Sequence, residues 1–576
     1  MKLRQNLLNA TVLLAELACS AGSPPSNVPN TTRTAVQEPS TPPVNSRGED
    51  YRPGLSRAAT RQRTIQQVIA RFDTLAKNGT QKPEAQSFIA RYAEPLSTAF
   101  VEGYDDLAPT TRINLVNLLV SFQHPDGVPA AVHALESYAK SAQQTEEAIW
   151  ACRLLQKVPS SSAASALMNV FNSIDMSNKN GRRVSAHLER AMLKNAHSSW
   201  INGLAQVLEQ NQERPASFND KTAVRVFRNR RYRQRVSVKL LGELRAGDKS
   251  RTVLRAWLTR SKRELHDDAQ LALLKLGRPA ISAAENLLAG ADEELVQLAQ
   301  ERYREQPKAH VLAGAQLLGY LGAPESYAAL AKAWETHHEA HLRVLLIYAM
   351  SALPKTDGTI DRWQRTFSNT SVKTTLPMGA SGLEALAEAG LRMFEPSLVE
   401  WVTPRVETLR GGGARKGDAQ RALILMISHL VLPQQANTAN RVALKYGGRV
   451  ATPAFERGVQ LANRCKGDAN CYLGAVRTSG TLTESDALQS IKSIAMVARF
   501  GGPPHKMHLV SLVSKVPQLQ VLKVLLRAIE YLSPQGDKVS SKQLADYAVT
   551  LDKPGSTTEQ HTIGSLIQQT ALRLAR

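Results

Sequence analysis

Apolar residues recur every three or four positions along almost the whole chain after about residue 55. This period places them on one side of an α-helix, whereas a half-buried strand would alternate strictly between apolar and polar residues. Runs of β-branched residues with such alternation are absent from the sequence. The pattern therefore predicts an all-α protein from about residue 56 to residue 576.

One helical unit is written at least twice. Segment 240–258, LLGELRAGDKSRTVLRAWL, contains an apolar stripe, a turn with Gly and Asp, and a second stripe that ends near Trp257. Segment 317–335, LLGYLGAPESYAALAKAWE, has the same layout and places Trp334 at the corresponding position. Similar anchors give a spacing of 32 residues three times, between Leu244 and Leu276, Leu321 and Leu353, and Phe500 and Leu532. A fixed period of this length predicts a stack of repeated helical hairpins.

Proline marks the start of the second helix in several units, at Pro279, Pro324 and Pro503. Neither helix of such a hairpin can bury its apolar stripe alone, so neighbouring hairpins must stack. We therefore expect one elongated α-solenoid of stacked hairpins over 56–576, with a continuous core and an extended concave face.

The turns carry a family resemblance. Segments 273–288, LLKLGRPAISAAENLL, and 317–334 both contain Leu-Gly-x-Pro between two helical stripes. This resembles the short HEAT repeats of bacteria, and the similarity extends over most of 110–555. The resemblance implies a HEAT-like α-solenoid of an exported bacterial protein, and it says little about function.

The N-terminus resembles a bacterial lipoprotein signal. Lys2 and Arg4 form a basic start, an apolar stretch follows from 7 to 17, and small residues surround Cys19. We expect 1–19 to be an export signal with Cys19 as the lipidated residue; the alternative is a frayed amphipathic helix. The Pro-, Ser- and Thr-rich segment 20–55 is then a disordered linker. These features predict that the protein is located in the cell envelope, either in the periplasm or at the outer membrane, where a lipid anchor is one form of attachment.

Three further cysteines bear on the compartment. Cys152 lies on an apolar helical face and is expected to be a buried free thiol. Cys465 and Cys471 bracket a polar turn between two helical patterns, so helix ends packed side by side would bring them within disulfide range. Two unpaired thiols or half of a metal site are the alternatives, although no nearby Cys or His supplies the other metal ligands.

Positive charge is concentrated in one segment. The chain has 72 Lys and Arg against 50 Asp and Glu, a formal net charge of +22. Segment 221–263 alone carries fifteen basic and two acidic residues. Its candidate anion-binding or partner-binding side chains are Arg228, Arg230, Arg231, Arg233, Arg235 and Lys239. We expect Arg228, Arg231, Arg235 and Lys239 to project together into solvent, and not into salt bridges between repeats, beside a buried stripe at Tyr232, Val236 and Leu240. The alternative is a solvated basic face without a dedicated ligand.

No catalytic motif is recognisable. A Gly-x-Ser-x-Gly elbow, a phosphate-binding loop and a dinucleotide fingerprint are all missing from the sequence, and the His-rich segment 337–341 lacks the His-Glu-x-x-His spacing of zinc proteases. The sequence thus favours a non-catalytic scaffold without cofactor or metal, which binds a protein or an anionic polymer of the envelope. The alternative is a nucleic-acid-binding HEAT-like protein, with or without enzymatic activity, that uses the basic segment 221–263.

Overall fold

The computed structural model describes residues 57–77, 80–210, 215–304, 306–354, 358–409, 411–478, 482–516, 518–551 and 557–576. The predicted signal 1–19 with Cys19 and the predicted linker 20–55 lie outside these residues. Within them the fold is all-α, since extended pairing is limited to one isolated bridge between Thr375 and Ser381. The predicted fold class is confirmed. None of the described helices combines the length and the apolar character that a membrane crossing requires.

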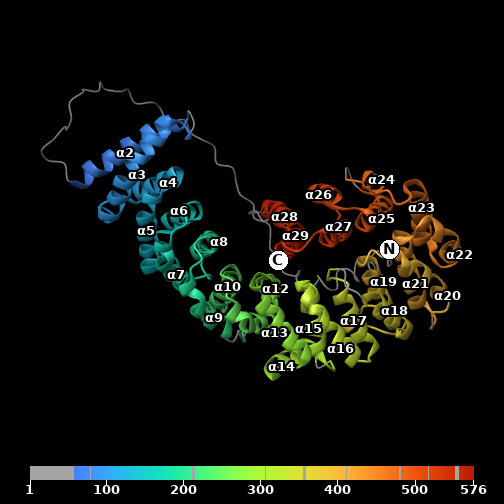
Figure 1. Cartoon of the computed structure of the whole chain (residues 1–576). Coiled ribbons are helices and arrows are strands. Elements are labelled where there is room, and N and C mark those ends of the chain that lie inside the picture. Colours follow the sequence, from blue (N-terminus) through green and yellow to red (C-terminus); the bar gives the residue numbers. More distant parts are fainter. Residues whose placement is uncertain are drawn as a thin grey trace. The chain divides into compact units, whose positions relative to one another are not determined.

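The described chain divides into two units, which are considered separately. The N-terminal unit comprises 57–203 and 215–236, and the C-terminal unit comprises 204–210 and 237–576. The helices of the N-terminal unit are α2 (Arg57–Ala76), α3 (Pro83–Glu102), α4 (Pro109–Phe122), α5 (Val128–Ser141), α6 (Thr145–Lys157), α7 (Ala164–Ser173) and α8 (Lys179–Lys194). Two helices are divided between the units, α9 (Ile201–Glu209) and α10 (Lys221–Glu243) (Figure 1).

The N-terminal unit is a double layer of helices. One layer runs through α4, α6 and α8, and the other through α3, α5 and α7 (Figure 1). Leucines without solvent exposure fill the space between the layers, among them Leu135, Leu154 and Leu188. Cys152 is a buried free thiol, as predicted, and burial raises its pKa to about 12. This layered packing of successive hairpins is the arrangement that the repeated apolar stripes require.

The C-terminal unit contains the remaining helices. They are α11 (Ser250–Leu258), α12 (His266–Leu276), α13 (Arg278–Ala289), α14 (Glu293–Arg302), α15 (Ala309–Leu321), α16 (Tyr327–Thr336), α17 (Ala340–Met350), α18 (Thr359–Asn369), α19 (Gly382–Arg392), α20 (Ser397–Glu407), α21 (Ala414–Leu430), α22 (Ala436–Tyr446), α23 (Gly448–Cys465), α24 (Ala469–Gly474), α25 (Glu484–Phe500), α26 (Pro503–Leu512), α27 (Leu519–Leu532), α28 (Lys538–Leu551) and α29 (Thr558–Leu574). Here α13, α15, α17, α19 and α21 pack on one another in sequence order.

The two matching sequence units form matching structures. In both, a short 3₁₀ turn, Gly247–Lys249 or Pro324–Ser326, separates the first helix from the second. The paired tryptophans Trp257 and Trp334 are buried, and each carries an arginine guanidinium over its ring, at 4.3 Å and 4.4 Å from the centroid. Those arginines, Arg302 and Arg343, come from helices that follow in the sequence. The two arginines follow their tryptophans by different distances in the sequence, so each cation–π contact is a local addition to the shared hairpin.

The C-terminal unit departs from an open stack. Its last helix, α29, packs on α12 (Figure 1). Gln569 of α29 also donates to the carbonyl of Tyr320 at 3.1 Å. In an open solenoid each hairpin contacts only its neighbours in sequence. The end of the chain instead returns to helices that precede it by more than two hundred residues. The expectation of one simple elongated stack is therefore wrong for this unit.

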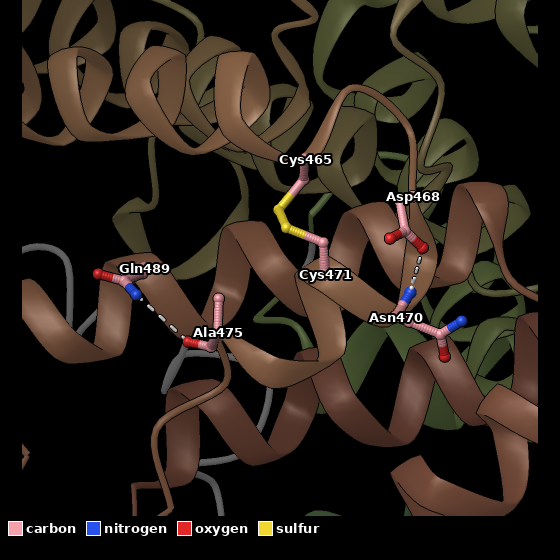
Figure 2. The surroundings of a disulfide bond; sticks show 6 residues. All are labelled: Cys465, Asp468, Asn470, Cys471, Ala475 and Gln489. Atoms are coloured by element: carbon pink, nitrogen blue, oxygen red, sulfur yellow. Dashed lines mark hydrogen bonds between the residues drawn. A yellow bond between two sulfur atoms is a disulfide. The ribbon is translucent and has the colours of Figure 1, made fainter.

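The predicted disulfide is present in the C-terminal unit. Cys465, the last residue of α23, is bonded to Cys471 in α24, with Cα atoms 5.3 Å apart (Figure 2). Asp468 caps the short helix α24 through a bond from the backbone N–H of Asn470, at 2.9 Å (Figure 2). The disulfide thus joins two helix ends across a tight turn, and the alternatives of free thiols or half of a metal site are excluded for this pair.

Candidate anion-binding surface

Helix α10 has the predicted rotation. Tyr232, Val236 and Leu240 are all buried, and the Tyr232 hydroxyl donates to the Ser185 carbonyl on α8 at 3.2 Å. Burial raises the pKa of Tyr232 well above 10, so the hydroxyl stays protonated as a donor. Because this stripe is held inside, the basic side chains on the opposite side of α10 are turned outward.

Two of the predicted ribbon residues are paired with acids. Arg235 lies 3.0 Å from a carboxylate oxygen of Glu189 on α8, and Lys239 lies 3.6 Å from Asp268 on α12. The expectation that the ribbon avoids salt bridges between repeats is wrong for these residues. Asp268 belongs to the neighbouring hairpin, whose acids the sequence offers as alternative partners of these cations, whereas Glu189 comes from the preceding helix α8.

The other predicted cations of α10 differ in exposure. Arg233 is half-buried and donates to the backbone carbonyl of Asn172, and burial lowers its pKa. Arg230 is also half-buried, whereas Arg228 and Arg231 are exposed. Arg233 is therefore a packing residue, and the solvent-facing part of the prediction is retained by the exposed pair.

The exposed ribbon begins earlier than the sequence indicated. Lys221 and Arg225 are exposed in the first turns of α10, and they continue the row of Arg228, Arg231 and Arg235. Successive members are three or four residues apart, so they lie on one side of the helix. The basic ribbon of α10 in the N-terminal unit therefore runs from Lys221 to Arg235.

Helices α8 and α6 widen the ribbon into a surface. Helix α8 buries Val184 and Leu188 and exposes five basic residues. Contacts between α8 or its preceding turn and α10 proceed in the same order on both segments, with Met176 bonded to Asn229, Ser185 to Tyr232 and Glu189 to Arg235. Helix α6 packs on the other side of α8. We call the resulting surface the basic face: Arg153 and Lys157 of α6, Lys179, Arg182, Arg183, Arg190 and Lys194 of α8, and Lys221, Arg225, Arg228, Arg231 and Arg235 of α10.

The acids on this face already have partners: Asp175, in the turn before α8, accepts a hydrogen bond from Ser177 and lies near Arg225 of α10. Glu146 pairs with Arg183, and Glu189 pairs with Arg235. Across the span of α8 and the first sixteen residues of α10, twelve basic side chains stand against the single acid Glu189. The field of this surface is therefore positive, and it would raise the local concentration of anions.

The sequence-based search missed α6 and α8. A signal was present, because Lys179, Arg183, Arg190 and Lys194 recur at spacings of four, seven and four residues, and so follow one side of a helix. The prediction is restricted to segment 221–263 because that segment has a higher density of positive charge than the segments of α6 and α8. The packing of α8 against α10 joins the two segments into one surface, and the density of charge along the sequence does not reveal that packing.

Metal ligation finds no support in the part of the chain that the structure describes, since no cluster of three His, Cys, Asp or Glu side chains is arranged for an ion there. In the His-rich segment 337–341, Glu339 lies 2.6 Å from the Nζ atom of Lys308, which also lies 3.2 Å from His337. This ion pair lowers the pKa of Glu339 to about 2. The segment thus forms a local electrostatic contact between helices.

Comparison with known proteins gives little further information. No protein-family model matches the chain, and no curated protein matches it. One similar solved structure is described as the crystal structure of an engineered protein; it is 12% identical, covers 76% of this chain and 98% of its own length, and superimposes with a TM-score of 0.22. A superposition this weak carries no argument about fold or function.

Proposed function

We propose that this protein is a non-catalytic HEAT-like scaffold of the bacterial cell envelope, and that it binds an acidic protein or an anionic polymer on the basic face. The observation that carries the proposal is the joining of cations from α6, α8 and α10 on one surface, where Glu146 and Glu189 are already in ion pairs. Guanidinium groups bind carboxylates and phosphates through two parallel hydrogen bonds, so a row of them favours an extended anionic ligand.

The cysteine pair supports the proposed location. A disulfide such as Cys465–Cys471 is typical of proteins that fold in an oxidising compartment. We further propose that 1–19 directs export and that Cys19 carries a lipid. Cell fractionation with labelled palmitate tests both points, and Cys19→Ser should abolish the label while leaving the folded chain soluble. Recovery of the chain in the cytosol with both thiols free would contradict the location.

The binding function is tested by charge reversal on α10. Arg225→Glu with Arg228→Glu should lower the salt concentration that elutes the protein from an anionic matrix, and should flatten the salt dependence of binding. Both side chains are exposed, so the melting temperature should change little, apart from a small loss where the carboxylate introduced at position 225 replaces the cation beside Asp175.

A matched control variant distinguishes an effect of the basic face from an effect of the total charge of the protein. Arg415→Glu with Arg449→Glu reverses two exposed arginines of the C-terminal unit and changes the formal charge by the same amount. Elution should move clearly less in this control than in the α10 variant. An equal shift of the elution salt concentration in both variants would show that the basic face is a solvated surface without a dedicated ligand.

Duplex DNA is the competing ligand. Displacement of an acidic peptide by DNA at physiological ionic strength, sensitive to Arg225→Glu with Arg228→Glu, would favour the nucleic-acid-binding function instead. Nucleic-acid affinity falls steeply with salt, so the comparison is made at one fixed ionic strength.

A further inference from the structure

His187 occupies the centre of the basic face. It lies midway along α8, and its backbone carbonyl accepts a hydrogen bond from Gln156 of α6 at 3.2 Å. Its ring is half-buried, and Nδ1 is a buried atom without a hydrogen-bond partner among the described residues. A titratable ring therefore sits where α6 and α8 meet, with its Nδ1 atom shielded from solvent.

The charged groups around His187 are mostly cationic. Arg183 and Arg190 lie one turn before and one turn after it on the same side of α8. From α6, Arg153 is held over the Trp150 ring at 4.3 Å, so an aromatic face positions this guanidinium. Burial lowers the pKa of His187 first, then Arg153, Arg190 and Arg183 lower it further, whereas the carboxylate of Glu146 on α6 raises it.

The remaining neighbours are accounted for. Glu146 of α6 is paired with Arg183, and Arg235 of α10 is paired with Glu189 of α8. Helix α7, which also packs on α8, has no charged side chain. Arg153 and Arg190 therefore leave a local excess of positive charge beside His187.

We propose that His187, Arg153 and Arg190 form a carboxylate-binding position for the acidic partner, and that His187 takes up a proton from solvent as the carboxylate binds. The proposal rests on the proposed function and specifies the partner as an acidic polypeptide. A carboxylate is favoured because the same surface already holds two carboxylates of its own, on Arg183 and Arg235.

The linkage has a definite sign. In the free protein, burial and three cations disfavour the charged ring, so His187 is neutral near pH 7. A bound carboxylate attracts the charged ring and raises its pKa, so the complex binds more protons than the separated partners. Affinity must then increase as the pH falls through the interval between the two pKa values.

A glutamate peptide tests the linkage without titrating itself. Its carboxylates have an ordinary pKa near ~4.3, whereas a phosphate would itself change charge near ~6. Binding of a rhodamine-labelled oligoglutamate peptide to the full chain is measured by anisotropy at constant ionic strength. We expect affinity to rise about threefold between about pH 8 and about pH 6, within the roughly tenfold that one unit of pKa shift permits. Calorimetry in two buffers of different ionisation enthalpy should show proton uptake on binding.

Two histidine variants complete the experiment. His187→Gln should bind the peptide with no pH dependence, whereas His197→Gln, in the turn after α8, should keep the wild-type slope. A flat wild-type profile, or an unchanged slope in His187→Gln, would overturn the proposal. If Arg225→Glu with Arg228→Glu still weakens binding in that case, the proposed function stands and only the His187 site fails. If polyphosphate binds more tightly than the peptide and is indifferent to His187→Gln, the assignment of an acidic polypeptide is overturned.

Discussion

Arg573, near the end of the chain, donates from Nε to the backbone carbonyl of Tyr320 at 2.9 Å, although 253 residues separate them. Tyr320 lies in the last turn of α15, where helix carbonyls lack partners within their own helix. The guanidinium is also held 3.1 Å from Glu530 of α27. A single side chain thus fastens α29 to both α15 and α27 within the C-terminal unit.

The same arrangement recurs in this unit. Arg527 donates to the carbonyl of Ala352 at 3.1 Å, just beyond α17. Lys492 is buried and donates to the carbonyl of Val431, directly after α21, and burial lowers its pKa to about 7, so it carries only part of a positive charge at neutral pH. The negative end of a helix dipole favours a cation at these positions. Part of the positive charge of the chain therefore serves helix packing, and only the remainder is available for a ligand.

Removal of the Arg573 side chain tests this fastening. Arg573→Ala removes the donor to the Gly319 carbonyl and one of the donors to Tyr320 and Glu530. Gln569 still donates to Tyr320, and Arg527 still pairs with Glu530, so we expect a loss of about 1–2 kcal/mol in unfolding free energy. Urea denaturation followed by helical circular dichroism measures it. The exposed Arg449→Ala should change stability by less than about 0.5 kcal/mol. Equal stability of both variants would show that the contact with Tyr320 contributes nothing.

The disulfide should stabilise the C-terminal unit modestly. Cys465 and Cys471 are six residues apart, and a loop of this length is expected to add about 2 kcal/mol by limiting the unfolded chain. We expect Cys465→Ser with Cys471→Ser to lower the denaturation midpoint accordingly. Mass spectrometry of non-reduced peptides should show the bond in the wild type and a free Cys152. Disulfide-linked peptides that contain Cys152 would contradict the assignment.

The different amounts of space around two helical glycines give a third prediction. Gly242 lies at a contact between hairpins, where an added Cβ would meet the Cα of Ala272 at 2.8 Å. Gly203 in α9 has no atom within 4 Å of the same position. Gly242→Ala should therefore destabilise the protein by about 1–2 kcal/mol, because overpacking outweighs helix propensity. Gly203→Ala should instead stabilise it by up to about 1 kcal/mol. Gains of similar size in both variants would exclude a tight approach at Gly242.

The repeat unit was predictable because its signals are local. Gly242 in LLGEL and Gly319 in LLGYL occupy the same place in their hairpins, and each faces an alanine thirty residues later, Ala272 or Ala349. The apolar stripe, the turn and this small-residue contact all lie within one period. Stacking of neighbouring hairpins then follows from burial of the stripes alone.

The return of the C-terminus and part of the basic face were not predictable in this way. The contact between Arg573 and Tyr320 joins segments that share no local pattern, because the distance between them is set by the accumulated geometry of the intervening hairpins. Likewise, Glu189 neutralises Arg235 from another helix, so a count of charges along α10 overstates its free charge. The density of basic residues along the sequence identified where cations are abundant, and only the packing of the helices shows which of them face solvent.

His266 should make the C-terminal unit sensitive to acid. Its ring is buried, and Nη1 of Arg302 lies 2.9 Å from Nε2, so the neutral ring accepts a hydrogen bond from a cation. Burial first, and then Arg302, lower the pKa of His266 from 6.5 to about 3. The folded protein thus resists a proton that the unfolded chain accepts below about pH 6.5. Its contribution to stability is complete above that pH and is lost progressively as the pH falls toward 3.

The size of this loss of stability follows from how far the pH lies below the pKa of the unfolded histidine. One unit below the unfolded pKa, at about pH 5.5, the loss should be about 1 kcal/mol relative to about pH 7.5. His266→Gln keeps an acceptor for Arg302 and does not titrate, so the variant should lose about 1 kcal/mol less than the wild type over the same interval. Urea denaturation at both pH values measures the difference, and His197→Gln, at a surface turn, serves as the control that follows the wild type. Identical acid sensitivity of wild type and His266→Gln would mean that His266 does not hold its neutral form against Arg302 in the folded protein.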